Sequence, residues 1–358
     1  MNKKPIILGI ESSCDETAAS IITENKQSTP KILSNVISSQ VEVHKEFGGI
    51  VPELAARAHI EKIDWITKKA IKDSGKKLED IDAIASTAGP GLIVCLSVGL
   101  SFGKTLAYSL NKPFIAVNHL EGHALSPKLN SKLDYPYLLL LISGGHSQFL
   151  SVEGLGKYKR LGTTIDDALG EAFDKTAKIL KIEFPGGPQI EALASKGDPN
   201  RYKLPKPIFH RGGCNLSFAG LKTAILRISK DIKTNKDKFD LAASFQKTIE
   251  EILNKKTKIA FEEFKKRNKK TKINNFVVAG GVAANKKIRQ MLIDLCKKEN
   301  FEPVFPLREF CGDNAAMIAM VGLEKFKLNQ FSPLDHPAIP RWPLDEDAVF
   351  LKGAGVKI

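Results

Sequence analysis

The chain has 358 residues, 42% of them hydrophobic and 26% charged, which is the composition of a folded globular protein long enough for two domains or one large α/β unit with two lobes. No apolar run reaches transmembrane length, and the start, MNKKPIILGIESS, reads as a first strand and not as a signal peptide, so we expect a cytoplasmic protein. Five widely spaced cysteines without a CxxC pair argue against a disulfide framework and a zinc ribbon.

The formal net charge of +14 predicts a polyanionic partner, and tRNA, rRNA, DNA or an anionic membrane would all satisfy it. Only nine of the 54 basic residues are arginine, so a lysine-rich composition explains the charge as well as selected phosphate contacts do. A basic cluster at the end of a predicted long helix would also complement the helix dipole. Its members are Lys265, Lys266, Arg267, Lys269, Lys270 and Lys272. The basic segment 201–211 is a second candidate contact.

Three apolar, strand-like segments open the first half of the chain. They are PIILGIESS, ETAASIITE and KILSNVISS, and polar turns separate them. The pattern then alternates between helical and strand periodicity. The predicted elements are a helix over 51–74, a strand over 82–87, a buried helix over 91–110, a strand over 113–120 and a helix that carries two histidines.

The second half repeats this plan around an insertion. Three strand segments, YPYLLLLIS, HSQFLSVEG and YKRLGTT, come first, and strand INNFVVAGG, a helix over 282–297, strand FEPVFP and a helix over 313–327 come last. The recurring order indicates that one supersecondary plan is duplicated in an α/β fold. We expect a first lobe over 1–134, a second lobe over 135–328 with a mostly helical insertion at about 165–272, and a proline-containing tail over 329–358.

The stretch NHLEGHALS places His119 and His123 four residues apart, and this spacing on a helix directs both imidazoles to one point. Such a pair can bind a metal ion. In the protease motif HExxH the glutamate follows the first histidine directly, whereas here Glu121 lies two positions on. Two residues are about 200° around a helix, so Glu121 would face away from the metal. The alternative is that the histidines cap the helix or bind a carboxylate.

Asp313, in CGDNAAMIAM, is the candidate third metal ligand, because it begins a predicted helix in the second half. Two histidines and one carboxylate would leave coordination positions open for substrate or water, as catalytic metal sites require. The alternative is structural, since aspartate is a favoured helix N-cap.

Two predicted hairpin turns occupy equivalent places in the halves, at 12–16 (SSCDE) and 143–147 (SGGHS). Glycines allow main-chain N–H groups to approach a phosphate closely, although Gly-Gly is also what a tight hairpin turn requires. A third turn, Gly280-Gly281, precedes a helix whose first turn holds Asn285, which would direct the positive end of a helix dipole at a ligand. Close packing of a strand on a helix is the alternative reason for these glycines.

The segment IDDALGEAFDK places Asp167, Glu171 and Asp174 at helical spacing on one face, with Asp166 beside them. Such a face is usually solvated. Beside a glycine-rich cleft, it could instead hold ribose or substrate hydroxyls.

The sequence resembles the tRNA N6-adenosine threonylcarbamoyltransferases, in their bacterial form, from about Ile6 to about Phe326. The motifs that carry this resemblance are GIESSCDET, GPGLIVCLSVG, NHLEGH, LISGGHSQF, DDALGEAFDK, FPGGP, NLSFAGLKTA, VAGGVAAN and CGDNAAMIA. The resemblance implies the actin-like, Hsp70-like ATPase fold, with two duplicated RNase H-like lobes and a helical insertion. This agrees with the duplicated order of strands and helices.

The resemblance also implies roles for individual residues. His119, His123 and Asp313 match the metal ligands of the family, for one divalent metal per chain, iron(II) in preference to zinc. Asp15 and Glu16 match acidic residues that are important for activity. The positions that match substrate-binding residues are Leu141, Ile142, Ser143, Gly144, Gly145, Asp174, Gly187 and Asn285. Archaeal and eukaryotic relatives have a metal-contacting tyrosine where this chain has Leu141, so their full coordination shell does not transfer.

The implied reaction is transfer of threonylcarbamoyl from threonylcarbamoyl-adenylate to N6 of the adenosine beside a tRNA anticodon, with release of AMP. The implied partners are tRNA, an inactive structural relative of the same fold and a small ATPase, and no membrane. Three other functions stay open from the residues alone. They are a small-molecule kinase of the actin-like class, a metalloprotease, which the position of Glu121 disfavours, and a nucleotide-switched scaffold without catalytic activity.

Overall fold

Two five-stranded sheets organise the chain, and each belongs to its own unit. The computed structural model describes residues 4–269, 271 and 273–349. Unit 1 comprises the chain up to Leu133 together with Pro306–Glu346, and unit 2 comprises Asp134–Phe305 and the chain end from Asp347. Within the described residues, no helix combines the length and the apolar character that crossing a membrane requires.

The sheet of unit 1 has the strand order β3-β2-β1-β4-β5. Strands β1 to β3 are antiparallel neighbours, and β4 and β5 continue the sheet parallel to β1. The strands are β1 Ile7–Glu11, β2 Glu16–Glu24, β3 Pro30–Ser39, β4 Ala83–Gly89 and β5 Phe114–Asn118. The helices are α1 Val41–Lys45, α2 Pro52–Asp73, α3 Ile93–Ser109, α4 His119–Leu125 and α10 Ala315–Lys327, with 3₁₀ turns at Leu78–Asp80, Ser126–Leu129 and Arg308–Phe310.

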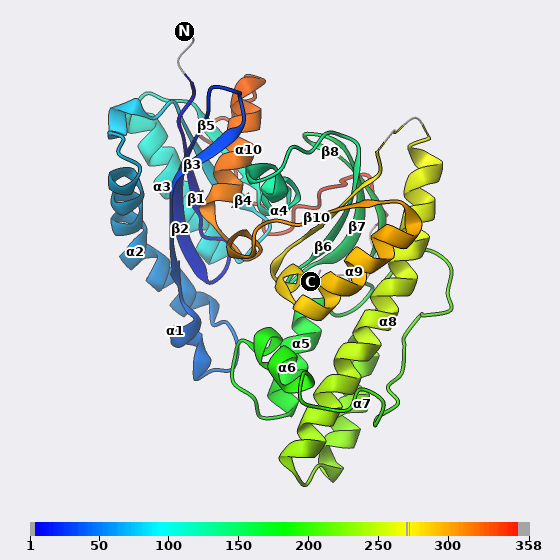
Figure 1. The fold of residues 1–358 in the computed structure, drawn as a ribbon. Coiled ribbons are helices and arrows are strands. Elements are labelled where there is room, and N and C mark those ends of the chain that lie inside the picture. Colours follow the sequence, from blue (N-terminus) through cyan, green and yellow to red (C-terminus); the bar gives the residue numbers. More distant parts are fainter. Residues whose placement is uncertain (1–3, 270, 272, 350–358) are drawn as a thin grey trace. The chain divides into compact units, whose positions relative to one another are not determined.

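Unit 2 repeats this plan, since its sheet has the order β8-β7-β6-β9-β10 with the same pattern of antiparallel and parallel neighbours (Figure 1). The strands are β6 Tyr137–Ile142, β7 Ser147–Gly154, β8 Lys157–Thr163, β9 Asn275–Ala279 and β10 Glu302–Val304. The helices are α5 Leu169–Ile179, α6 Gly186–Ala194, α7 Ala219–Ile228, α8 Asn235–Arg267 and α9 Lys286–Glu299, with 3₁₀ turns at Ser229–Asp231 and Gly281–Ala284. The duplicated sheets confirm the predicted α/β class, and α5 to α8 confirm a helical insertion.

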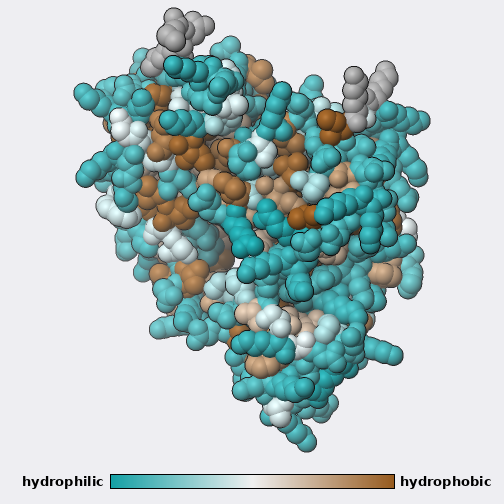
Figure 2. All heavy atoms as spheres, in the orientation of Figure 1, coloured by the Kyte–Doolittle hydropathy of each residue, from teal (hydrophilic) through white to brown (hydrophobic). Residues whose placement is uncertain are grey.

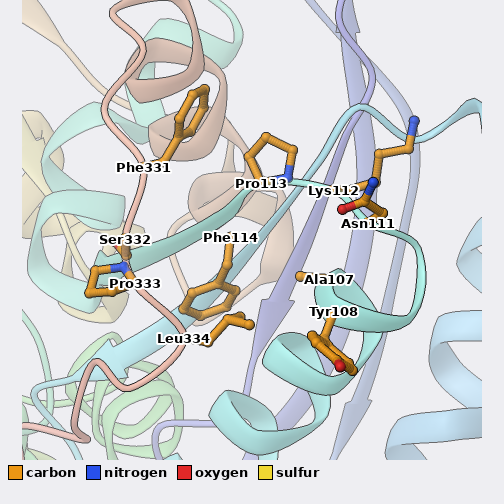
Figure 3. A pocket seen from close by; sticks show the side chains of 10 residues that line it. All are labelled: Ala107, Tyr108, Asn111, Lys112, Pro113, Phe114, Phe331, Ser332, Pro333 and Leu334. Atoms are coloured by element: carbon orange, nitrogen blue, oxygen red, sulfur yellow. The ribbon is translucent and has the colours of Figure 1, made fainter.

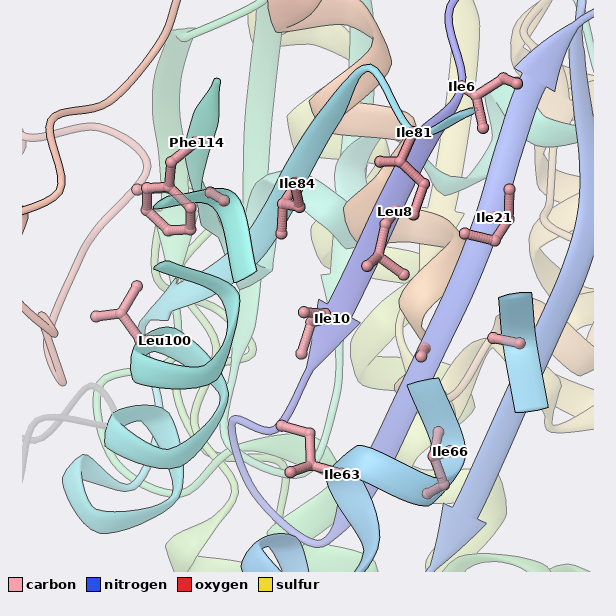
Figure 4. Packing of buried hydrophobic residues seen from close by; sticks show 14 of the residues in the cluster. Ile6, Leu8, Ile10, Ile21, Ile63, Ile66, Ile81, Ile84, Leu100 and Phe114 are labelled. Atoms are coloured by element: carbon pink, nitrogen blue, oxygen red, sulfur yellow. The ribbon is translucent and has the colours of Figure 1, made fainter. Parts of the chain in front are cut away.

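The core of unit 1 follows from the two-residue period of β1. Leu8 and Ile10 face the side on which Ile63 and Ile66 of α2 pack (Figure 4). Gly9 faces the other side, where a side chain would lie 2.4 Å from the carbonyl oxygen of Ala315 in α10. Helix α10 therefore lies directly on the sheet because glycine leaves room for its backbone. Glu11, two residues further along β1, belongs to the same face.

This packing explains one difference from the predicted organisation. We expected α10 to belong to the second lobe, within 135–328, but the segment Pro306–Glu346 is part of unit 1. Gly322 of α10 approaches Ile7 and Ala85 so closely that a Cβ atom there would lie 2.6 Å from that of Ala85. Strand β1 and helix α10 thus pack directly against each other although they are far apart in the chain.

The segment after α10 contains no helix within the described residues and runs along β5 and β4 of unit 1. The Ser332 N–H donates to the carbonyl of Phe114 (2.8 Å), and the Ile339 N–H donates to that of Ala88 (2.7 Å). A cavity of about 370 Å³ lies between this segment, the end of α3 and the start of β5, with Tyr108 and Phe331 among its lining residues (Figure 3). None of the predicted site residues lines this cavity.

We predict that Gly9→Ala lowers the free energy of unfolding by about 1–3 kcal/mol, because the added methyl group would overlap backbone atoms of α10 that cannot move independently. Chemical denaturation measures the change. Gly49→Ala is the control, since no atom lies within 4 Å of a Cβ at this position. Equal unfolding midpoints for the two variants would contradict the proposed close packing of β1 on α10.

Candidate functional site

His119 and His123 lie on the short helix α4, directly after strand β5. The Asn118 side chain caps the helix by accepting a hydrogen bond from the Leu120 N–H (2.9 Å). Both histidines are buried, and their ring centroids lie 4.8 Å apart with the planes at 87°. The four-residue spacing therefore places the rings side by side, as predicted.

Asp313 lies just before α10 and does not cap it. The cap is Asn314, whose side chain accepts a hydrogen bond from the Met317 N–H (3.0 Å), so the predicted helix start at 313 was wrong by two residues. The Asp313 carboxylate faces the histidines instead. Its Oδ1 lies 3.0 Å from Nε2 of His123 and 3.4 Å from Nε2 of His119.

These three residues have the geometry and the donor types of a metal site. One potential ligand atom from each of His119, His123 and Asp313 lies within 4.8 Å of the other two. Two imidazoles and one carboxylate suit zinc or iron and leave coordination positions open. The structure thus brings together the three ligands that the sequence predicted, and they could hold one divalent ion.

Glu11 supports this group and was not predicted as a site residue. Its Oε2 lies 3.0 Å from Nδ1 of His119 and accepts a hydrogen bond from the Thr87 hydroxyl (2.7 Å), and its Oε1 accepts one from the Ser13 N–H (2.5 Å). A carboxylate on Nδ1 favours the tautomer with the proton on Nδ1, which leaves Nε2 to bind a metal. The sequence did contain a signal for Glu11, because it is a charged residue at the end of an otherwise apolar strand.

The charges of this group stabilise one another. Burial opposes ionisation of Asp313, but the charge of His119 and hydrogen bonds from both imidazoles hold the pKa of Asp313 well below its usual range. Burial likewise opposes a charged His119, but the carboxylates of Asp313 and Glu11 raise the pKa of His119 well above its ordinary value. A proton on His119 therefore balances the carboxylates around it, and a divalent ion bound through Nε2 would replace that proton.

Glu121, the residue between the two histidines, faces away from them as predicted. Its Oε2 lies 3.1 Å from Nζ of Lys325, and both side chains are largely buried. This ion pair joins α4 to α10. Glu121 therefore lies where it cannot serve as the general base of a metalloprotease.

Asp15 and Glu16 lie where β1 turns into β2, in the same unit as the histidines. Burial and the nearby charge of Asp313 raise the pKa of Asp15. Burial, Asp313 and Asp15 together raise the pKa of Glu16 to about 10, so Glu16 carries a proton at neutral pH in the metal-free protein. The turn thus holds two carboxyl groups that share the electrostatic environment of the candidate metal ligands.

The predicted glycine turns lie in unit 2. Ser143 closes the turn between β6 and β7, because its N–H donates to the carbonyl of His146 (2.8 Å) and its hydroxyl accepts from the His146 N–H (3.1 Å). No atom lies within 4 Å of a Cβ built on Gly144 or Gly145. Backbone atoms of this turn are accessible to a ligand.

Leu141 and Ile142 precede this turn in β6 and are fully buried. A substrate could meet them only through the main chain, because their side chains belong to the core. The hydrocarbon side chain of Leu141 also offers no atom that could coordinate a metal.

The turn at Gly280 adjoins the end of β6 in the same unit. Gly280 has φ +94°, and a Cβ there would lie 2.5 Å from the carbonyl oxygen of Ile142, so only glycine fits. A 3₁₀ turn follows, and α9 begins at Lys286 with Asn285 as its N-cap. The Asn285 side chain accepts from the Lys287 and Ile288 N–H groups and donates to Gln246. The predicted continuous helix from 282 is therefore interrupted.

Asp174 and Gly187 are linked through the start of α6. The Asp174 Oδ1 accepts a hydrogen bond from the Gly186 N–H (2.9 Å). No atom lies within 4 Å of a Cβ built on the neighbouring Gly187. The structure thus brings the two predicted positions together at one helix end.

The predicted acidic face of α5 is only partly present. The helix begins at Leu169, so Asp166 and Asp167 lie outside it. Asp166 accepts hydrogen bonds from the Phe218 and Ala219 N–H groups at the start of α7. Lys175 pairs with Asp167 (2.7 Å) and with Glu171 (2.8 Å). Asp166, Asp167 and Glu171 are thus held by contacts within unit 2, and Asp174 binds the start of α6.

Comparison with known proteins gives consistent matches. A family model described as "TsaD: tRNA N6-adenosine threonylcarbamoyltransferase" matches residues 31–320. A protein of that name from Pelagibacter ubique is 80% identical over the full length of both chains. Another, from Rickettsia massiliae, is 52% identical over 95% of this chain and 98% of its own. Among solved structures, HypF in its phosphate- and nucleotide-bound form has a TM-score of 0.56 at 15% identity, over 93% of this chain and about half (48%) of HypF. The last match concerns the fold alone.

We predict that a His119→Ala, His123→Ala double variant loses its metal while the protein stays folded. Removal of two of three ligands should weaken metal binding more than about 100-fold, since even changes in the outer shell cost 10- to 100-fold. Metal analysis and circular dichroism test this expectation. His210→Ala, an exposed histidine in unit 2, is the control. Full metal occupancy in the double variant would refute the ligand assignment.

Proposed function

Because this chain belongs to the tRNA N6-adenosine threonylcarbamoyltransferase family, we propose that it transfers a threonylcarbamoyl group to N6 of an adenosine in tRNA. The observation that carries this proposal is the full-length match at 80% identity, and the His119, His123 and Asp313 group supports it. The donor in this proposal is threonylcarbamoyl-adenylate, and the acceptor is the adenosine beside the anticodon. AMP leaves.

The proposed step is an acyl transfer. The N6 nitrogen bonds to the carbamoyl carbon, the bond from that carbon to the AMP phosphate oxygen breaks, and N6 loses one proton. An exocyclic adenine amine is a poor nucleophile, so the protein must supply orientation and stabilise the charge that develops on oxygen.

His119, His123 and Asp313 would hold one divalent metal, for which we propose iron(II) in preference to zinc. When bound, such an ion supplies a template and a Lewis acid for oxygens of the donor. Glu11 would keep the Nε2 atom of His119 available to it. The proximity of three donor atoms of suitable chemistry supports this assignment.

The glycine turns of unit 2 would bind the adenylate. Main-chain atoms of Leu141 to Gly145 and the turn at Gly280 offer close backbone approach, and the first turn of α9 adds the positive end of a helix dipole. Asp174 and Gly187 would contact hydroxyl groups of the donor. Asn285 would act through the helix start that it caps, since its side chain already bonds Lys287 and Ile288.

Asp15 and Glu16 are the proposed proton-transfer groups. A carboxyl group whose pKa is raised accepts a proton more readily than an ordinary carboxylate, once it is deprotonated. The pKa values of both residues are raised, in part by the negative charge of Asp313, which supports this role.

We also propose that the reaction takes place in the cytoplasm, with an inactive relative of the same fold and a small ATPase as partners.

Both candidate tRNA contacts contain exposed basic residues. Hydrophilic residues cover most of the face shown in Figure 2. In the basic cluster, Lys265 donates to the carbonyl of Glu299 and Arg267 pairs with Glu153, while Lys270 and Lys272 lie outside the described residues. Lys266 and Lys269 are exposed, as are Lys203 and Arg211 of the segment 201–211.

We predict that Lys266→Gln with Lys269→Gln weakens tRNA binding and lowers the dependence of log K on log salt concentration by about one unit per contacting lysine. Filter binding at several salt concentrations measures both. Lys68→Gln, which removes a lysine already paired with Asp64, is the control. An unchanged affinity and an unchanged slope would indicate that these lysines face solvent and do not contact tRNA. The segment 201–211 would then be tested in the same way.

We predict that Gly144→Val or Gly281→Val abolishes transfer but leaves the metal bound and the protein folded. A Cβ atom at either position has no non-neighbouring protein atom within 4 Å, so we expect the added side chain to act on the ligand and not on the fold. The assay supplies preformed threonylcarbamoyl-adenylate, tRNA and the partner proteins, and measures modified adenosine and AMP. Gly49→Val, in unit 1, is the control.

Two results would overturn the proposal. Normal transfer by the Gly144→Val and Gly281→Val variants would refute the adenylate site. Failure of the wild-type protein to modify adenosine, combined with cleavage of a protein or phosphorylation of a small acid or sugar, would refute the transferase assignment itself.

A further inference from the structure

Three consecutive carbonyl groups of the turn after β1 each accept a hydrogen bond from a different element. The Leu92 N–H donates to Ser13 (2.9 Å), and the Gln40 N–H donates to Asp15 (3.0 Å). The carbonyl between them, that of Cys14, lies 3.0 Å from Nε2 of His59 in α2. His59 thus supplies the only side chain among these three donors, at the centre of the turn that carries Asp15 and Glu16.

The partners of His59 determine its protonation state. A carbonyl oxygen only accepts hydrogen bonds, so Nε2 carries the proton. Nδ1 lies 2.7 Å from the Thr17 hydroxyl, which donates to it. Burial lowers the pKa of His59, in agreement with a neutral ring. The ring is therefore held in one tautomer and one orientation.

A second layer continues this chain of donors away from the turn. The Gln40 amide nitrogen lies 3.4 Å from Nδ1 of His59, and its Oε1 lies 3.2 Å from Nε2 of His44. The His44 Nδ1 accepts from the Val51 N–H, at the start of α2 (3.4 Å). His59, Gln40 and His44 are all fully buried. Every donor in this series of hydrogen bonds faces an acceptor. The series connects α1 and α2 to the Cys14 carbonyl.

Apolar packing of α2 on the sheet does not by itself call for a histidine at this position. The other residues on the buried face of α2 are small or apolar apart from Thr67, and they include Ala55, Ala58, Ile63 and Ile66. A leucine would cover the sheet without the cost of burying an imidazole. Neither His59 nor Gln40 is hydrogen-bonded to His119, His123 or Asp313. The network therefore ends at the acidic turn, and the turn itself reaches His119 through the Ser13 hydroxyl (3.2 Å).

We propose that His59, supported by Thr17 and Gln40, is a positioning residue that fixes the Asp15–Glu16 turn for threonylcarbamoyl transfer. The inference rests on the proposed function and adds a residue to it. His59 acts by holding the Cys14 carbonyl, which sets where the next two carboxyl groups point. A displacement of about 1 Å at a reacting group can cost about 100-fold in rate.

The test compares His59→Leu with His59→Gln, whose amide keeps a donor for Cys14 and an acceptor for Thr17. His59→Leu should lower kcat for transfer about 10- to 100-fold with unchanged metal content, and His59→Gln should restore most of it. Amide hydrogen exchange at residues 14–17 should be faster in His59→Leu and close to wild type in His59→Gln. If His59→Leu does not fold, Thr17→Val is tested in its place. It should lower kcat by less than His59→Leu, and it should also speed amide exchange at residues 14–17.

A double variant separates positioning from general destabilisation. In a Glu16→Gln, Asp15→Asn background, His59→Leu should cause no further loss of transfer, because the groups it positions are already disabled. Equal losses in both backgrounds, or wild-type kcat and exchange in folded His59→Leu, would overturn the inference. If Glu16→Gln and Asp15→Asn themselves transfer normally, the proton-transfer roles in the proposed function fail, while the exchange measurement still decides whether His59 fixes the turn.

Discussion

The close packing of α10 on the first sheet is the constraint on which the candidate metal site depends. Gly9 and Gly322 remove the side chains that would hold helix and sheet apart, so the backbone of α10 lies against β1 and β4. The same helix packs on α4, where Gly122 faces Met317 and Ile318. Because Asp313 directly precedes Asn314, the N-cap of α10, these contacts place its carboxylate beside two histidines that are 190 or more residues away in the chain.

The duplicated lobes use equivalent turns for different chemistry. In unit 1, the turn between the first two strands carries Asp15 and Glu16, and its carbonyls are held by surrounding elements. In unit 2, the equivalent turn carries Gly144 and Gly145, which are both exposed. One backbone plan therefore supports an acidic, tightly fixed turn in one unit and a glycine turn with exposed backbone in the other.

Local patterns in the sequence were sufficient for the strands, for the duplication and for the histidine pair, because each depends on periodicity over a few residues. The start of α10 was misplaced because Asp313 and Asn314 are both good caps, and only the structure shows that Asn314 is used. Glu11 and His59 were missed for another reason. Their partners His119 and Cys14 are 108 and 45 residues away, so no local pattern indicates the contacts. The assignment of α10 to unit 1 is likewise a tertiary effect.

The discontinuity of unit 1 bears on how the protein is made. Its first segment ends at Leu133, and the ribosome then synthesises Asp134–Phe305 of unit 2 before Pro306–Glu346 emerges. At about 5–20 residues per second, this delay is on the order of 10 to 30 seconds. During that time β1 and β4 lack the helix that covers one face of their sheet, and the two histidines lack Asp313. Unit 2 is nearly contiguous and can fold before Pro306–Glu346 emerges, so the sheet of unit 1 and the His119, His123 and Asp313 group are completed only after most of unit 2 has been synthesised.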